Sequence, residues 1–134
     1  MNLERLFRPQ SVAVYGGKWS DYVVQQCRKL GFQGEIWHVH PTKKNCINAT
    51  DNLPGVPDSV FLGINRDLTV NEFYSLRKKG IGGAVIFASG FNEEEDGAEF
   101  TIRLDKAAGD IPYIGPNCYG FANFFDRVAL WPDQ

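Results

Sequence analysis

Five short apolar runs, separated by segments of mixed polarity, dominate the pattern of this chain. The runs are rich in valine, isoleucine and phenylalanine, and glycine or proline follows several of them. Runs this short and this apolar are typical of strands that are buried on both faces of a parallel sheet. The predicted strands are residues 11–15, 35–39, 59–64, 83–87 and 111–114.

Apolar residues recur at helical spacing in three of the intervening segments. In the first of these, Val23, Cys27 and Leu30 lie at positions i, i+4 and i+7. Thr69 and Glu72 have the spacing of a capping box and are predicted to begin the second helix. The predicted helices are 21–30, 69–79 and 97–108, and each is followed by a glycine that favours a helix end.

Two segments have weaker patterns. Residues 42–57 show no clear period and are predicted to form a loop or a short helical excursion. Residues 123–134 are predicted to add one or two strands, after which the chain stops without a terminating feature. We therefore expect residues 1–134 to be a single domain from the N-terminal part of a larger multidomain protein.

Strands that alternate with helices predict an α/β fold. The expected topology is a doubly wound, open parallel sheet between helices, in three α/β/α layers, with right-handed crossover connections. The length of 134 residues and the hydrophobic share of 43% suffice for one sizeable core.

Composition excludes several classes of protein. No apolar run reaches the ~18 residues of a membrane span, and the first residues lack a secretory signal. The net charge of −2 argues against a general nucleic-acid binder. Three widely spaced cysteines indicate reduced thiols, so we expect a cytoplasmic protein. His38 and His40, two residues apart, fit no common metal-ligand motif, and no metal is expected.

Ligands of open α/β sheets bind at the carboxyl ends of the strands, so the residues that follow each strand are the candidate site. The first strand is followed by Gly16, Gly17, Lys18 and Ser20. Two glycines allow backbone N–H groups to approach a phosphate at the start of a helix. Asp21 stands where a dinucleotide-binding fingerprint has its third glycine, so a plain strand-to-helix turn stays an alternative.

The second strand is followed by His40, Pro41, Lys43 and Lys44. An NAD site usually has an acidic residue at this place, where it binds the ribose hydroxyls. Lysines instead suit an additional phosphate on the ribose, as in NADP or in the 3′-phosphate of coenzyme A. The alternative for an isolated lysine pair is a solvated loop.

Small and polar residues follow the remaining strands and leave room for an extended ligand. These candidates are Asn65, Arg66, Ser89, Gly90, Asn117 and Cys118. A purely structural loop of the same composition is the alternative. No histidine lies near Cys118 in the sequence to activate it as a nucleophile, so no catalytic residue is assigned.

Four segments together resemble a known family. They are Leu6–Val14, the stretch from Gly31 through Trp37 to Pro41, Ala88-Ser89-Gly90-Phe91-Asn92-Glu93, and Ile114-Gly115-Pro116-Asn117-Cys118-Tyr119-Gly120. In this order and spacing they resemble the coenzyme A-binding domain of NDP-forming acyl-CoA synthetases. That family includes ADP-forming acetate–CoA ligase and the α subunit of succinyl-CoA synthetase.

The resemblance implies a Rossmann-like fold with coenzyme A or acyl-CoA as its ligand. In the full proteins of this family, acyl-CoA and phosphate exchange through an acyl phosphate, and a phosphohistidine passes the phosphoryl group to ADP or GDP. That histidine belongs to the next domain, and neither His38 nor His40 matches it. The resemblance therefore implies a domain that is not catalytic alone, with ligase and ATP-grasp domains or subunits as partners, and a homo-oligomer is compatible with it.

Two alternatives stay open at this stage. One is the NAD(P)-binding domain of an oxidoreductase, which the missing third glycine and the missing acid disfavour. The other is a degenerate Rossmann-like module with a regulatory or interaction role. Its support is the first loop, Gly16-Gly17-Lys18-Trp19-Ser20-Asp21, which is shorter than the corresponding loop of the family.

Overall fold

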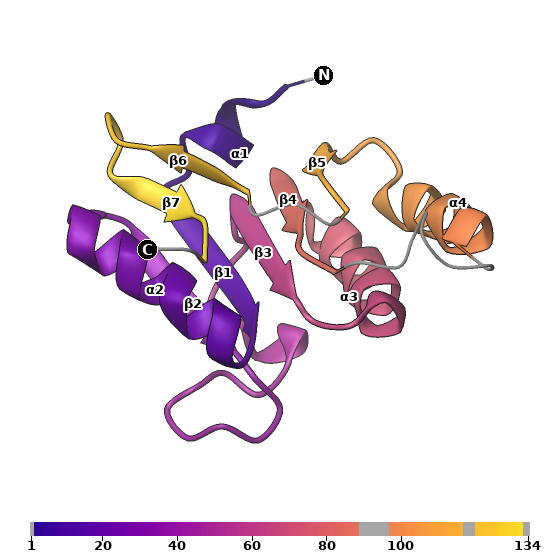
Figure 1. Ribbon diagram of the computed structural model, residues 1–134, viewed down its shortest axis with the longest axis horizontal. Helices are drawn as coiled ribbons and strands as arrows, with labels where there is room; N and C mark the ends of the chain where they lie inside the picture. Colours follow the sequence, from indigo (N-terminus) through magenta and orange to yellow (C-terminus); the bar gives the residue numbers. More distant parts are fainter. Residues whose placement is uncertain (1, 89–96, 117–119, 133–134) are drawn as a thin grey trace.

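A parallel five-stranded sheet forms the centre of the molecule (Figure 1). The computed structural model describes residues 2–88, 97–116 and 120–132. The strands, in the sheet order β2-β1-β3-β4-β5, are β2 (Glu35–Val39), β1 (Ser11–Gly16), β3 (Ser59–Gly63), β4 (Gly83–Ile86) and β5 (Tyr113–Ile114). All four pairings are parallel, so the predicted α/β class and open parallel sheet are confirmed.

Helices cover both faces of the sheet and complete the three layers. α2 (Lys18–Leu30) lies on one face, and α3 (Arg66–Lys79) and α4 (Gly97–Ala108) lie together on the other. The short α1 (Glu4–Phe7) precedes the sheet. Residues 42–57 contain one 3₁₀ turn, Thr50–Asn52, which matches the short helical excursion expected there.

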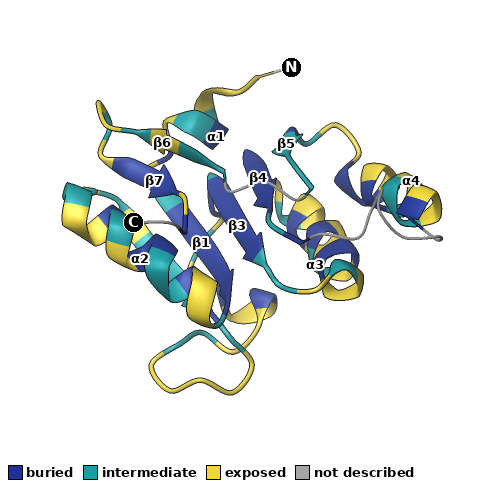
Figure 2. Ribbon diagram, in the orientation of Figure 1, coloured by how far each residue is buried: buried dark blue, intermediate teal, exposed yellow. Residues whose placement is uncertain are grey.

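Alternate residues of the central strands enter two separate cores. Val12 and Val14 of β1 pack toward α2, whereas Ala13 and Tyr15 pack toward α3 and α4. This alternation follows from the two-residue period of a strand. The central strands are dark blue in Figure 2 because both of their faces are covered. Their continuous apolar sequence is thereby explained.

Two predicted helix starts were wrong by about one turn. α2 begins at Lys18 rather than Asp21, and α3 begins at Arg66 rather than Thr69. The cap of α3 is Asn65, whose side chain accepts a hydrogen bond from the Leu68 N–H at 2.9 Å. Thr69 lies inside the helix, where its hydroxyl donates to the Asn65 carbonyl at 2.8 Å. Asparagine is as effective a cap as threonine, and Asn65 stands only two residues after the end of β3.

A two-stranded antiparallel hairpin follows the parallel sheet. It consists of β6 (Phe121–Asn123) and β7 (Val128–Leu130). β7 lies within the range in which strands were expected, and β6 begins two residues before that range. Val128 and Leu130 are fully buried against α2. The Cys27 thiol of α2 donates to the Ala129 carbonyl at 3.3 Å, which ties the helix to the hairpin.

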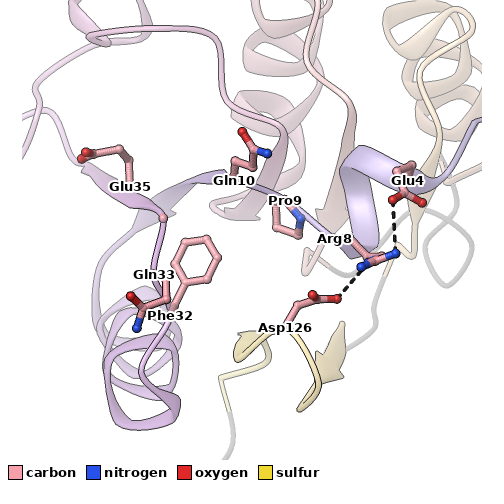
Figure 3. A pocket seen from close by; sticks show the side chains of 9 residues that line it. Glu4, Arg8, Pro9, Gln10, Phe32, Gln33, Glu35 and Asp126 are labelled. Atoms are coloured by element: carbon pink, nitrogen blue, oxygen red, sulfur yellow. Dashed lines mark hydrogen bonds and ion pairs between the residues drawn. The ribbon is translucent and has the colours of Figure 1, made fainter.

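A further cavity lies at the amino-terminal edge of the sheet, opposite the carboxyl ends of the strands. Its volume is about 600 Å³, and Gln10 and Gly34, which precede β1 and β2, contribute to its wall. Figure 3 shows Arg8 between two acidic residues of this cavity. Arg8 is paired with Asp126 at 3.1 Å and with Glu4 at 3.5 Å. The arginine is thus already neutralised by the protein itself.

No helix in the described ranges combines the length and the apolar character that a membrane crossing requires.

The burial of Cys27 predicts a thiol of low reactivity. Burial raises the pKa of Cys27, so it has less reactive thiolate near neutral pH than an ordinary cysteine. In a Cys46→Ser, Cys118→Ser variant, we expect Cys27 to react with a disulfide reagent at least about tenfold more slowly than a model thiol. The rate should rise only above the pH at which ordinary thiols ionise, or when the hairpin opens. A variant that retains only Cys46, which is half-buried, is the control, and rapid labelling of Cys27 in the folded protein would contradict the described packing.

Candidate ligand-binding cleft

The strand order places a topological switch point between β1 and β3. From β1 the chain continues outward to β2 on one side, then returns to β3 and proceeds through β4 to β5 on the other. Ligands of such sheets bind in the crevice beyond the carboxyl ends at this point. A cavity of about 380 Å³ lies there, and residues that end β1, β2 and β3 line it. They include Gly16, Gly17, Val39, His40, Pro41, Gly63, Ile64 and Asn65.

Gly16 permits the ends of β1 and β3 to lie unusually close together. Its φ is +122°, and a Cβ atom there would be 2.3 Å from the Gly63 carbonyl oxygen. Gly17, in contrast, has no atom within 4 Å of the position of a Cβ. Gly16 therefore shapes the loop, and Gly17 faces open space beside the cleft.

Ser20, another expected site residue, has a structural role. It is fully buried, and its hydroxyl donates to the Tyr15 carbonyl at 2.5 Å. The hydroxyl thus holds the first turn of α2 against the end of β1. Lys18 is exposed at the first position of α2, with its Nζ 5.8 Å from the centre of the Trp19 ring.

The amino end of α2 has no side-chain cap. Gly17 occupies the capping position and has no side chain to accept the first N–H groups. Such a helix start keeps hydrogen-bond donors and a partial positive charge available for an anion. The loop that follows β1 thus has the local features of a phosphate site.

His40 organises the loop that follows β2. Its Nδ1 accepts hydrogen bonds from the Lys43 N–H at 2.9 Å and from the Thr42 N–H at 3.2 Å. An accepting Nδ1 means a neutral ring that has its proton on Nε2. His40 and Pro41 both line the cavity, so the loop presents a fixed wall to it.

Lys43 forms an ion pair with Asp21 of α2. Its Nζ lies 2.5 and 2.6 Å from the two carboxylate oxygens of Asp21. Asp21 also lies 3.7 Å from Nδ1 of His38, whose Nε2 donates to the Gly16 carbonyl at 2.9 Å. Sequence reasoning treated Asp21 only as the absence of a glycine and missed its role as the partner of Lys43. Both side chains are more than a third exposed, so the pair is easily exchanged.

Asn65 and Arg66 differ in their positions. Asn65 caps α3 and lines the cavity. Arg66 does not line the cavity, and its guanidinium lies 4.2 Å from the centre of the Phe100 ring on α4. Four further candidates, Ser89, Gly90, Asn117 and Cys118, lie outside the described residues.

Three polar side chains beside the cleft form a hydrogen-bonded network that the sequence did not indicate. The Tyr15 hydroxyl lies 2.7 Å from Thr50 Oγ1, and the Thr50 hydroxyl donates to Glu72 Oε2 at 2.5 Å. Burial raises the pKa of Tyr15 well above its usual range, with the nearby Glu72 charge acting in the same direction, so Tyr15 stays protonated. These residues come from β1, the 3₁₀ turn and α3, and no local motif links them.

Comparison with known proteins identifies relatives over nearly the whole chain. The chain is 33% identical over 148 residues to ADP-forming acetate–CoA ligase II from Archaeoglobus fulgidus, an alignment that covers 98% of this chain and 22% of the relative. It is 30% identical over 141 residues to a trans-feruloyl-CoA synthase from an unknown prokaryotic organism, covering 96% of this chain and 20% of the relative. The chain thus spans about a fifth of the length of these relatives.

The fold has counterparts among solved structures. The dinucleotide-forming acetyl-coenzyme A synthetase 1 of Ca. Korarchaeum cryptofilum, in its apo form, superposes with a TM-score of 0.85. The match covers 99% of this chain and 31% of that chain at 23% sequence identity. This likeness supports the Rossmann-like three-layer fold.

Membership of a family decides between the candidate ligands. The sequence model of the CoA binding domain matches residues 10–123, which include the loops that follow β1, β2 and β3. This match favours coenzyme A over a nicotinamide dinucleotide. The chain belongs to the CoA binding domain family and is a coenzyme A-binding domain, homologous to part of the ADP-forming acyl-CoA synthetases.

Proposed function

We propose that this chain holds coenzyme A in the cleft beyond the carboxyl ends of β1, β2 and β3. The observation that supports this most directly is the cavity of about 380 Å³ at the switch point, formed by loops inside the matched family region. Cavities for ligands of drug size begin at about this volume. The cavity therefore accommodates one end of coenzyme A, and the rest of the ligand extends along the sheet edge toward the carboxyl ends of β4 and β5.

The two helix starts at this edge suggest how the ligand is oriented. α2 has no side-chain cap, so its N–H groups suit the phosphates beside Gly17 and Lys18. The first turn of α3 is already capped by the Asn65 side chain, and the cavity beside it includes the apolar residues Ile64 and Leu68. We place the adenine end there. Lys43, at the end of β2, is then available to the ribose 3′-phosphate.

We further propose that the domain supplies coenzyme A within an acid–CoA ligase that forms ADP or GDP. The curated relatives include an acetate–CoA ligase described as ADP-forming. In such a protein, a phosphohistidine and a nucleotide-grasping element would come from other domains or subunits. His38 and His40 are both engaged in holding loops of this domain. We place the protein in the cytoplasm, as a single domain of a larger chain that is able to form homo-oligomers.

The first prediction concerns ligand preference. The domain should bind coenzyme A more tightly than NAD or NADP. The family match favours coenzyme A over both dinucleotides, and Lys43 and Lys44 replace the acid that binds the ribose of NAD. Calorimetric titration with all three ligands measures this. Tighter binding of NAD would refute the proposal, and no binding of any of them would favour the degenerate interaction module.

Gly17→Val tests the position of the phosphates. A side chain at this position projects into open space, so the domain should fold normally while the branched group blocks the approach of a phosphate to the backbone. We expect at least about a tenfold loss of affinity for coenzyme A. Gly17→Ala, which adds one methyl group, should retain more affinity.

Gly16→Ala separates this effect from damage to the loop. The Cβ of the new alanine would collide with the Gly63 carbonyl. The substitution should therefore lower the free energy of unfolding by about 2–4 kcal/mol. Normal folding together with normal affinity in Gly17→Val would exclude this loop as the phosphate site.

Lys43→Ala tests the contact with the ribose phosphate. A charge-assisted contact predicts a loss of about 1–2 kcal/mol for coenzyme A and almost none for its 3′-dephospho form. The ion pair with Asp21 does not prevent the contact, because an exposed pair is worth only about 0–1 kcal/mol. Asp21→Asn should accordingly leave binding intact or improve it.

Lys29→Ala is the matched control, since Lys29 is an exposed lysine in the last turn of α2 and lines neither cavity at the carboxyl edge. Both affinities should be measured at low and at high salt, because screening weakens such a contact. Equal losses for coenzyme A and dephospho-coenzyme A in Lys43→Ala would place the action of Lys43 elsewhere.

A further inference from the structure

Glu72 is a carboxylate in a wall of the cleft that is otherwise largely apolar. It extends from the second turn of α3 and is half-buried. The lining residues near this wall come from the end of β3, from α3 and from the turn before Thr50, and they include Ile64, Leu68 and Ala49. An acidic side chain in such a position needs a hydrogen-bond donor.

One oxygen of this carboxylate has a donor within the protein. The Thr50 hydroxyl donates its only hydrogen to Glu72 Oε2, so the protonated Tyr15 hydroxyl is the donor to Thr50. Tyr15 is 3% exposed and Thr50 is 5% exposed, so both hydroxyls are held in place by the core. The sequence of donors thus ends at Glu72 and orients its carboxylate.

The other oxygen, Oε1, accepts no hydrogen bond from any residue in the described part of the chain. It belongs to a residue that lines the cavity. The free oxygen is therefore an acceptor held in a fixed orientation on a half-buried residue.

We propose that Glu72 determines specificity for the base of the ligand by accepting a hydrogen bond from the exocyclic amino group of adenine. This inference rests on the proposed function, since it requires the adenine end of coenzyme A to occupy this cavity. Apolar walls suit a heteroaromatic ring, and a carboxylate recognises an N–H donor on the edge of such a ring.

The ribose phosphate is a poorer partner for Glu72. Lys43, the candidate for that phosphate, lines a neighbouring cavity together with Lys44 and Arg28 rather than the cavity that contains Glu72. A phosphate would be repelled by the carboxylate and attracted by these cations. The cavity that contains Glu72 therefore suits the neutral adenine, and the cavity that contains Lys43 suits the negatively charged ribose phosphate.

The test compares coenzyme A with an analogue whose adenine is replaced by purine, which lacks only the 6-amino group. The wild-type domain should bind coenzyme A about tenfold more tightly than the purine analogue, as expected for a hydrogen bond to a charged group. In Glu72→Met, which has a similar volume and no strong acceptor, the ratio of the two affinities should fall to about one. Glu72→Gln retains a neutral acceptor and should give an intermediate ratio.

Glu35→Met is the matched control, because Glu35 is exposed at the opposite end of β2 and should leave the ratio unchanged. Thermal melts establish that each variant folds, and Glu72→Gln supports the test alone if Glu72→Met does not fold. An unchanged ratio in the folded Glu72 variants, or equal binding of both ligands by the wild type, would overturn the role of Glu72 while leaving coenzyme A binding established. Failure of the wild type to bind coenzyme A at all would instead overturn the proposed function and this inference with it.

Discussion

The close approach of β1 and β3 at their carboxyl ends is the constraint on which the cleft depends. Gly16 lies opposite Gly63 in the register, and a Cβ on Gly16 would overlap the Gly63 carbonyl. A Cβ on Gly63 would likewise meet Ser20 Oγ at 2.7 Å. Neither position admits a side chain, so the two strand ends lie close together at the switch point. α2 begins there, two residues after Gly16. The Gly16 carbonyl then accepts from His38, which links β2 to the same loop.

The apolar pattern allowed the sheet, its class and the number of main helices to be predicted, because buried parallel strands leave a strong signal in sequence. The helix starts were harder to predict from the sequence. Asn65 and Thr69 are both good capping residues, and only the position of the strand end selects between them. Gly17, His40 and Pro41 were proposed as candidates because they follow strands, and all three line the cavity. Ser20 lies in the first turn of α2 rather than in the loop, and its burial depends on the packing of α2 on β1.

The contacts that sequence analysis missed join residues far apart in the chain. Lys43 meets Asp21 across the groove between α2 and the loop after β2, and Glu72 meets Thr50 across the edge of α3. Neither pair has the spacing of a motif, since the partners are brought together only by the order of the strands. Lys43, which the sequence analysis assigned to a phosphate, thus has an acidic partner that limits the positive charge of its loop. Because the pair is exposed and weak, replacing Asp21 by a phosphate costs little.

The two edges of the sheet show why size does not indicate the ligand-binding cavity. The amino-terminal cavity is larger, yet its Arg8 is satisfied by Glu4 and Asp126. At the carboxyl edge, the starts of α2 and α3 both follow strand ends, so their partial positive charges meet at the smaller cavity. The Asn65 side chain accepts from one N–H group of α3, whereas Gly17 has no side chain to accept from those of α2. This difference between the two helix starts gives the edge one side suited to phosphate and one suited to a neutral base, and that asymmetry matches a nucleotide end such as that of coenzyme A.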